Sequence, residues 1–90
     1  MLNEVKNALR ITDNEFNEEI NTLIEACKKD LELSGIASNS IVESDSLIKR
    51  AIINYCKAEF GYDNPDSEKF RQSYESLKTH LSISYRIDEV

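Results

Sequence analysis

The sequence predicts an all-α protein, a small four-helix bundle made of one short N-terminal helix and three longer helices, followed by an extended C-terminal tail. Apolar residues recur at steps of three and four along most of its 90 residues, which is the helical period. Turn-forming residues, namely Gly35, Gly61 and Pro65, stand between these periodic segments. We therefore expect residues 1–82 to form one helical domain and residues 83–90 to form the tail.

The first expected helix covers residues 2–9. Leu2, Val5 and Leu9 would share one face of it, and Asn3 is a candidate N-cap. A helix of two turns is unstable alone in water, so this segment must dock on the rest of the chain.

A capping box marks the start of the second expected helix. The Thr12 side chain can accept a hydrogen bond from the backbone N–H of Glu15, and the Glu15 side chain can reach back to the N–H of Thr12. Ile11 and Phe16 stand at the two positions of a hydrophobic staple. These signals together place the helix start at Thr12.

The body of this second helix carries one apolar stripe, made of Phe16, Ile20, Leu23, Ile24, Cys27 and Leu31. Its opposite face is rich in glutamate, and is either a solvated face or a negatively charged functional surface. The helix would end at Gly35, which can turn left-handed and let Ile36 pack back on Leu31.

The longest apolar-rich segment is LIKRAIINYCKAEFG, residues 47–61. As a helix it would spread its apolar side chains over roughly 220°, against about 100° for an ordinary surface helix. It is therefore either the central helix of the bundle or a helix with a second partner, such as another copy of the chain. Ser44 or Asp45 would cap it, and Gly61 would end it as Gly35 ends the second helix.

Two residues of this central helix are candidate protein-interaction residues. Glu59 points into the apolar band, and a buried carboxylate needs a partner. It either reaches water near the helix end or forms an ion pair across a subunit boundary. Ile53 lies just beyond the band, where core packing and subunit contact would compete.

The fourth expected helix follows a turn, with Asn64 as its N-cap and Pro65 at its first position. Its narrow apolar stripe is made of Phe70, Tyr74, Leu77 and Leu81.

After the fourth helix the period changes from helical to two. Ile83, Tyr85 and Ile87 alternate with polar residues, as in an extended strand. With no other strand in the chain to pair with, such a tail either frays or pairs with another chain. Ile83, Tyr85, Arg86 and Ile87 are therefore candidate protein-interaction residues.

The formal charge of the chain is −6, from 17 acidic and 11 basic residues. DNA binding draws its affinity from basic residues that displace counterions at phosphates, so specific binding to DNA or to an anionic membrane is disfavoured. No apolar run approaches the ~20 residues of a membrane span, and MLNEVKNALR lacks the apolar core of a secretory signal. A chain of this size gains modest stability from its core, which favours self-association.

The residue types needed for catalysis or metal binding are few and scattered. His80 is the only histidine, and no serine or cysteine nucleophile can be paired with it from the sequence. The sequence also contains no phosphate-binding loop. Cys27 and Cys56 fall on apolar helix faces, as buried free thiols do. The acidic cluster at residues 63–68 lacks the glycine and the glutamate that an EF-hand loop needs at its sixth and twelfth positions. We expect no catalytic residue, no cofactor and no metal site.

Several segments in a fixed order carry a family resemblance. In the first half these are VKNALRIT, then Asp13, Phe16 and Ile20, then LIEACKKDLELSGI. In the second half the segment is AIINYCKAEFGYDNPDSEKFRQSYESLKTHL, with a central helix, a Phe-Gly turn and a Tyr-x-x-Leu helix. The chain thus resembles the small head–tail connector (adaptor) proteins of tailed bacteriophages, also described as DNA-packaging or head-completion proteins. Order and spacing along nearly the whole chain carry the resemblance, because no single motif is diagnostic.

The resemblance implies a non-enzymatic structural subunit. Such a subunit would assemble as a homo-oligomeric ring of about a dozen copies beneath the portal protein. The ring would extend the channel through which DNA passes without specific binding, and would dock the next head-completion or tail protein. Its C-terminal segment, here Ile83 to Val90, would reach the portal or a neighbouring subunit.

The expected location is the head–tail junction of the virion, after assembly in the cytoplasm of the host bacterium. The residues alone also allow a second function, that of a small acidic regulatory module that binds a basic protein.

Overall fold

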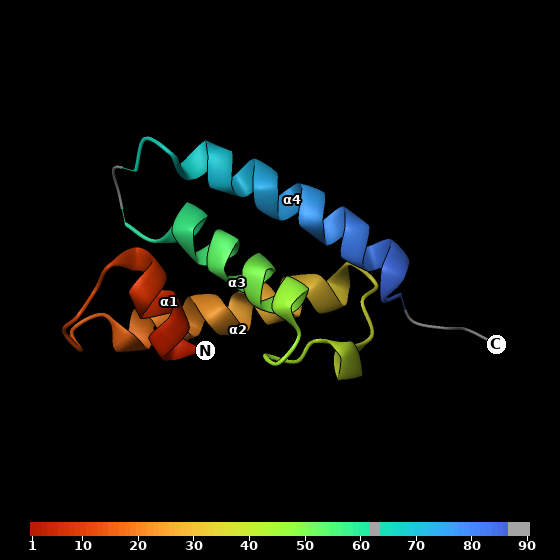
Figure 1. The fold of residues 1–90 in the computed structure, drawn as a ribbon, viewed down its shortest axis with the longest axis horizontal. Coiled ribbons are helices and arrows are strands. Elements are labelled where there is room, and N and C mark those ends of the chain that lie inside the picture. Colours follow the sequence, from red (N-terminus) through yellow and green to blue (C-terminus); the bar gives the residue numbers. More distant parts are fainter. Residues whose placement is uncertain (62–63, 87–90) are drawn as a thin grey trace.

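The computed structural model of the chain describes residues 1–61 and 64–86. The helices are α1 (Leu2–Leu9), α2 (Asn17–Leu33), α3 (Ser46–Glu59) and α4 (Ser67–Ser84), with a short 3₁₀ turn, η1 (Ser38–Ser40), between α2 and α3 (Figure 1). Within the described ranges there is no β-strand, only an isolated antiparallel bridge between Ile36 and Arg86. The expected all-α fold with a short first helix is confirmed.

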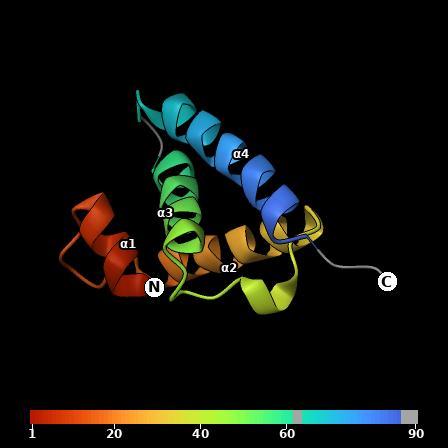
Figure 2. The same ribbon diagram turned by 45° about the vertical axis from the view of Figure 1, so that its right-hand side comes forward.

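The central helix of the bundle is α3, which packs against each of the other three helices. Figures 1 and 2 show it between α1 and α4, with α2 crossing beneath. This position explains the wide apolar band of α3, because three neighbours cover different parts of its surface. The helices form an elongated body of 46 × 23 × 18 Å.

The core runs along the faces where these helices meet. Its largest fully buried side chains are Val5, Ile20, Cys27, Leu31, Ile36, Ile48, Ile52, Cys56 and Leu81. Most of them are stripe residues of the expected helices, so the hydrophobic pattern of the sequence identifies the interior. Truncating one of the large aliphatic side chains to alanine costs about 2–5 kcal/mol, a large share of the stability of so small a domain.

The start of α2 differs from the expectation. The helix begins at Asn17, with Phe16 as its N-cap and no side-chain capping bond, so the capping box at Thr12 and Glu15 is wrong. Residues 13–16 form turns instead, in which the Asp13 carboxylate accepts from the N–H of Glu15 at 3.1 Å. Phe16 lies outside the stripe and meets Phe60 edge to face, with ring centroids 5.4 Å apart.

The ends of α1 differ in a similar way. Its N-cap is Met1, without a side-chain capping bond, so Asn3 is not the cap. At the other end Arg10 takes the left-handed conformation, with φ at 61°, and the N–H of Ile11 donates to the carbonyl of Lys6 at 2.9 Å. This C-terminal motif separates α1 from the turns that precede α2.

Three other helix boundaries follow the expected chemistry. Gly35 has a φ of 95°, and the next residue, Ile36, is fully buried with its N–H directed to the carbonyl of Leu31. Asp45, and not Ser44, caps α3, because its Oδ1 accepts from the N–H groups of the second and third helical residues at 2.8 and 3.2 Å. Gly61 also has a positive φ, 86°, just after α3.

The turn between α3 and α4 uses Asn64 differently from the expectation. The helix begins at Ser67, so Asn64 and Pro65 precede it and are not its cap and first residue. The Asn64 side chain instead accepts from the N–H of Asp66 at 3.0 Å and donates to the carbonyl of Lys57 at 3.0 Å. One amide thus joins the start of α4 to the end of α3.

The loop before α3 lies on the bundle. Ile36 is buried and Ile41 is partly buried against the core. Glu43 accepts from the amino group of Met1 at 2.9 Å and from Lys28 at 3.0 Å, and these two bonds lower the pKa of its carboxyl. None of the helices in residues 1–61 and 64–86 has the length and apolar character needed to span a bilayer.

Candidate protein-interaction site

The C-terminal end of α4 holds three of the expected interaction residues. The helix continues through Ser84, two residues beyond the expected boundary, so Ile83 is helical and not extended. Tyr85 ends the helix, and its carbonyl accepts from the N–H of Ala37 at 2.9 Å. Arg86 then forms the bridge with Ile36, so the start of the tail has a partner within the chain, contrary to the expectation. Ile87 lies outside the described residues.

Asp45 binds Tyr85 and caps α3 at the same time. Its Oδ1 accepts from two backbone N–H groups at the start of α3, while its Oδ2 accepts from the Tyr85 hydroxyl at 2.7 Å. The bond from Tyr85, followed by that from the N–H of Ile48, lowers the pKa of the Asp45 carboxyl. The same bond to a carboxylate raises the pKa of the Tyr85 hydroxyl. Tyr85 is therefore an anchor, and Ile83 and Arg86 are the accessible residues of this end.

Two exposed apolar residues stand at the C-terminal ends of α2 and α4. Ile83 is 68 % exposed in the last turn of α4, and Leu33 is 76 % exposed as the final residue of α2. Figure 1 shows both helix ends at the same end of the molecule as the C-terminus, and the bridge between Ile36 and Arg86 joins them. We did not single out Leu33 from the sequence, although it is an apolar residue off the stripe of its helix, which was the available signal.

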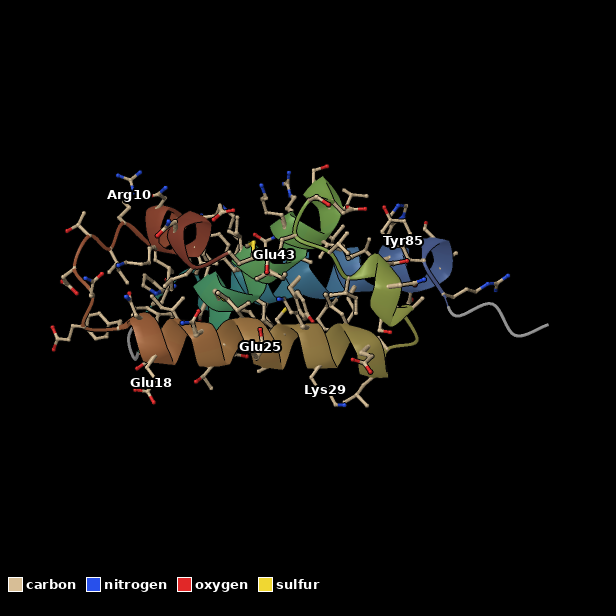
Figure 3. All side chains as sticks on the ribbon, turned by 90° about the horizontal axis from the view of Figure 1, so that it is seen from below. Arg10, Glu18, Glu25, Lys29, Glu43 and Tyr85 are labelled. Carbon is tan, nitrogen blue, oxygen red and sulfur yellow. The ribbon has the colours of Figure 1, made fainter. Side chains whose placement is uncertain are left out.

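Glu59 and Ile53 belong to a different part of the molecule. Glu59 is exposed at the end of α3 and accepts from Arg71 of α4 at 2.7 Å, so it has an ion-pair partner within the chain. The end of α3 lies toward the Arg10 end of the elongated body, away from Tyr85 (Figures 1 and 3). Ile53 is partly buried against the core. The six candidate residues therefore do not form one site.

A partly buried polar link joins α2 to α4. The Tyr74 hydroxyl donates to Asp30 Oδ2 at 2.6 Å, and Lys78 donates to the same oxygen at 3.0 Å. Burial by itself would raise the pKa of Asp30, but the bonds from Tyr74 and Lys78 outweigh it and lower the pKa. Burial, followed by the bond to Asp30, raises the pKa of Tyr74. A hollow of about 250 Å³ opens beside this link, between Asp30, Tyr55 and Arg71.

Two cysteines and one histidine are the side chains considered for chemistry. Cys27 and Cys56 are buried free thiols, and burial raises the pKa of each to about 12, which suppresses the reactive thiolate. His80 is exposed on α4. The part of the chain that the structure describes contains no group of three metal-ligating side chains.

Comparison with protein families agrees with the resemblance seen in the sequence. A family model described as phage connector protein matches residues 1–88. No curated protein and no solved structure is similar enough to the chain to count as a match. Connectors are structural components of the virion that contact the portal and other structural proteins of the phage. Because the match extends over nearly the whole chain, this protein belongs to the phage head–tail connector family.

Proposed function

We propose that the chain is a connector subunit that assembles as a ring of about a dozen copies beneath the portal. The ring extends the DNA channel and gives the next head-completion or tail protein a surface on which to dock. Assembly takes place in the cytoplasm of the host bacterium. The finished ring remains at the head–tail junction of the virion.

The observation that best supports this proposal is the apolar C-terminal end of the bundle. Leu33 and Ile83 expose most of their surface there, beside the point at which the chain leaves the helices. Large apolar side chains exposed at one end of a molecule are candidates for contact with another protein. We assign Ile83, Arg86 and Ile87 to contact with the portal or a neighbouring subunit, and Tyr85 to holding that segment in place.

The net charge of −6 suits a protein that surrounds moving DNA. Like charges repel, so an acidic channel wall does not retain the phosphate backbone. Glu59 has an ion-pair partner within its own subunit, which supports its position near water at the helix end over a pair across a subunit boundary.

Electron microscopy of the cognate portal, with and without this protein, tests the proposal. We expect an added ring of density with the wild type. We expect none with the double variant Leu33→Lys and Ile83→Lys, which removes both exposed apolar side chains. Ser84→Lys is the matched control, because it adds charge at the same helix end without removing an apolar group. A portal that gains no density with the wild-type protein would contradict the proposal.

A further inference from the structure

A polar groove lies between α3 and α4. Its volume is about 570 Å³, and its lining includes Arg50 and Asn54 from α3 and Lys69, Gln72, Ser76 and His80 from α4. No residue of α2 and no carboxylate lines it within the described parts of the chain. The groove is therefore a basic and hydrogen-bonding surface on a protein whose net charge is −6.

The two cations of this groove have no counterion among the residues that the structure describes. Arg50 and Lys69 take part in none of the ion pairs formed within residues 1–61 and 64–86, although acidic residues outnumber basic ones by 17 to 11. Lys28, Arg71 and Lys78 do bind carboxylates in these ranges, whereas Arg50 and Lys69 are among several basic residues that do not and are the two that line one groove together. An unpaired pair of cations in a groove without carboxylates favours an anionic occupant.

The same chain carries an anionic surface on α2. Its exposed residues include Glu18, Asn21, Thr22 and Glu25, and we name these four residues the acidic face. Glu25 also pairs with Lys28 of its own helix at 3.5 Å, whereas Glu18 takes part in none of the ion pairs formed within residues 1–61 and 64–86. Figure 3 shows the Glu18 side chain pointing away from the other helices.

The acidic face and the groove are on different sides of the molecule. The hollow beside Asp30 of α2 lies on the side of the α3–α4 pair that faces α2. The groove has no α2 residue in its lining, so it opens on the other side of that pair. One subunit therefore presents a basic surface on one side and an acidic surface on another.

We propose that the α3–α4 groove of one copy receives the acidic face of the next copy. An interface of this kind joins two different surfaces, and it closes into a ring when the rotation between copies allows. Charge complementarity sets which surfaces meet and speeds their encounter. This inference rests on the proposed function, and it names the surfaces through which the subunits of the ring join.

The charges favour a second copy over nucleic acid as the occupant. Two unpaired cations offer few phosphate contacts, and the −6 net charge repels DNA at longer range. A second copy of the chain supplies the complementary carboxylates at a fixed spacing on one helix face. The interface should weaken as salt rises, because its charges lie at the surface.

Two charge-reversed variants test the pairing in solution. R50E/K69E makes the groove acidic, and E18K/E25K makes the α2 face basic. Sedimentation velocity at low salt and high protein concentration should show self-association of the wild type, and about tenfold or more weaker association for each variant alone. R10E/K49E changes the net charge as R50E/K69E does, but at two residues that line neither the groove nor the acidic face, and it should associate as the wild type does.

The mixture of the two variants is the decisive sample. The acidic groove of R50E/K69E matches the basic face of E18K/E25K, and the unchanged groove and face also match, so the mixture should associate as strongly as the wild type. Thermal melts show whether each variant is folded. Association of R50E/K69E alone at the wild-type level would overturn the proposal. So would a mixture of folded variants that does not associate.

Two further outcomes separate this proposal from its alternatives. If wild-type protein and both variants all add the same ring to the portal, the interface is wrong and the connector function stands. If the mixture associates in solution but the wild type adds no density to the portal, the interface stands and the proposed function fails. The proposal would also be overturned if the wild type retarded DNA in a gel, R50E/K69E did not, and the mixture of the two variants did not associate. That result would identify nucleic acid as the occupant of the groove.

Discussion

The substitution Tyr74→Phe probes the link between α2 and α4. It removes only the hydroxyl that donates to Asp30 Oδ2 at 2.6 Å and leaves the ring, which is 3 % exposed, in the core. A hydrogen bond to a charged group contributes about 1.5–3 kcal/mol to stability. The Asp30 side chain is 39 % exposed and keeps its bond from Lys78. Water can therefore replace part of the lost hydrogen bond, and the lower end of this energy range applies.

We therefore expect Tyr74→Phe to lower the free energy of unfolding by about 1.5 kcal/mol. In a domain of 60–100 residues each kcal/mol changes the melting temperature by about 4–8 °C, so Tm should fall by about 6–12 °C. Far-UV circular dichroism during heating measures this change, because the signal reports the helices.

Tyr55→Phe is the matched control for this experiment. Tyr55 contacts Tyr74 edge to face at 5.1 Å between ring centroids, but within the described residues its hydroxyl forms no hydrogen bond to the protein. Its loss should change Tm by no more than about 2–4 °C, since a surface-accessible group is typically worth within ±0.5 kcal/mol. Equal melting temperatures for Tyr74→Phe and the wild type would refute the reasoning, because the bond to Asp30 would then contribute nothing.

Three other predictions concern acid, thiols and the apolar end. The folded state lowers the pKa of the Asp30 carboxyl below its usual value of 3.8, so the stability that the ionised carboxylate contributes is complete above pH 3.8 and is lost as pH falls through the folded pKa. The Tm difference between the wild type and Tyr74→Phe should therefore shrink on acidification, and a constant difference from neutral to acid pH would contradict this. The thiols of Cys27 and Cys56, each with a pKa of about 12, should react slowly with iodoacetamide in the native protein and fully in urea, as measured by mass spectrometry. Rapid labelling of the native protein would mean that the thiols are accessible. Leu33→Lys and Ile83→Lys should leave Tm nearly unchanged, because both side chains are exposed and a cation suits a helix C-terminus; a fall of more than about 5 °C would place them in the core.

The helices and their core could be predicted because both follow from local pattern. The stripe of α2 and the wide band of α3 identify most buried residues, and Gly35 and Asp45 mark boundaries through chemistry that acts within a few residues. The start of α2 could not be predicted in the same way. Phe16 leaves the helical stripe to meet Phe60, a contact between residues 44 positions apart that local capping signals do not contain.

The C-terminal residues show the same limit. Alternation over a few residues indicates an extended strand, yet Ile83 and Ser84 complete a helix and Tyr85 ends it. The partners that fix this conformation, Ala37 and Asp45, lie far away in the sequence. The ion-pair partner of Glu59 could not be predicted for the same reason, because Arg71 belongs to the next helix and meets Glu59 only through the packing of α3 against α4.

The shared carboxylate of Asp45 gives this small protein a path for mechanical load. A pull on the chain beyond Arg86 acts first on the bridge to Ile36 and on the Tyr85 hydroxyl, and through that hydroxyl on the first turn of α3. Since α3 packs against every other helix, the load spreads into the whole bundle and not into a loose terminus. Because such coupling is reciprocal, a ligand or substitution that destabilises the first turn of α3 also changes the affinity of the C-terminal segment for its binding partner.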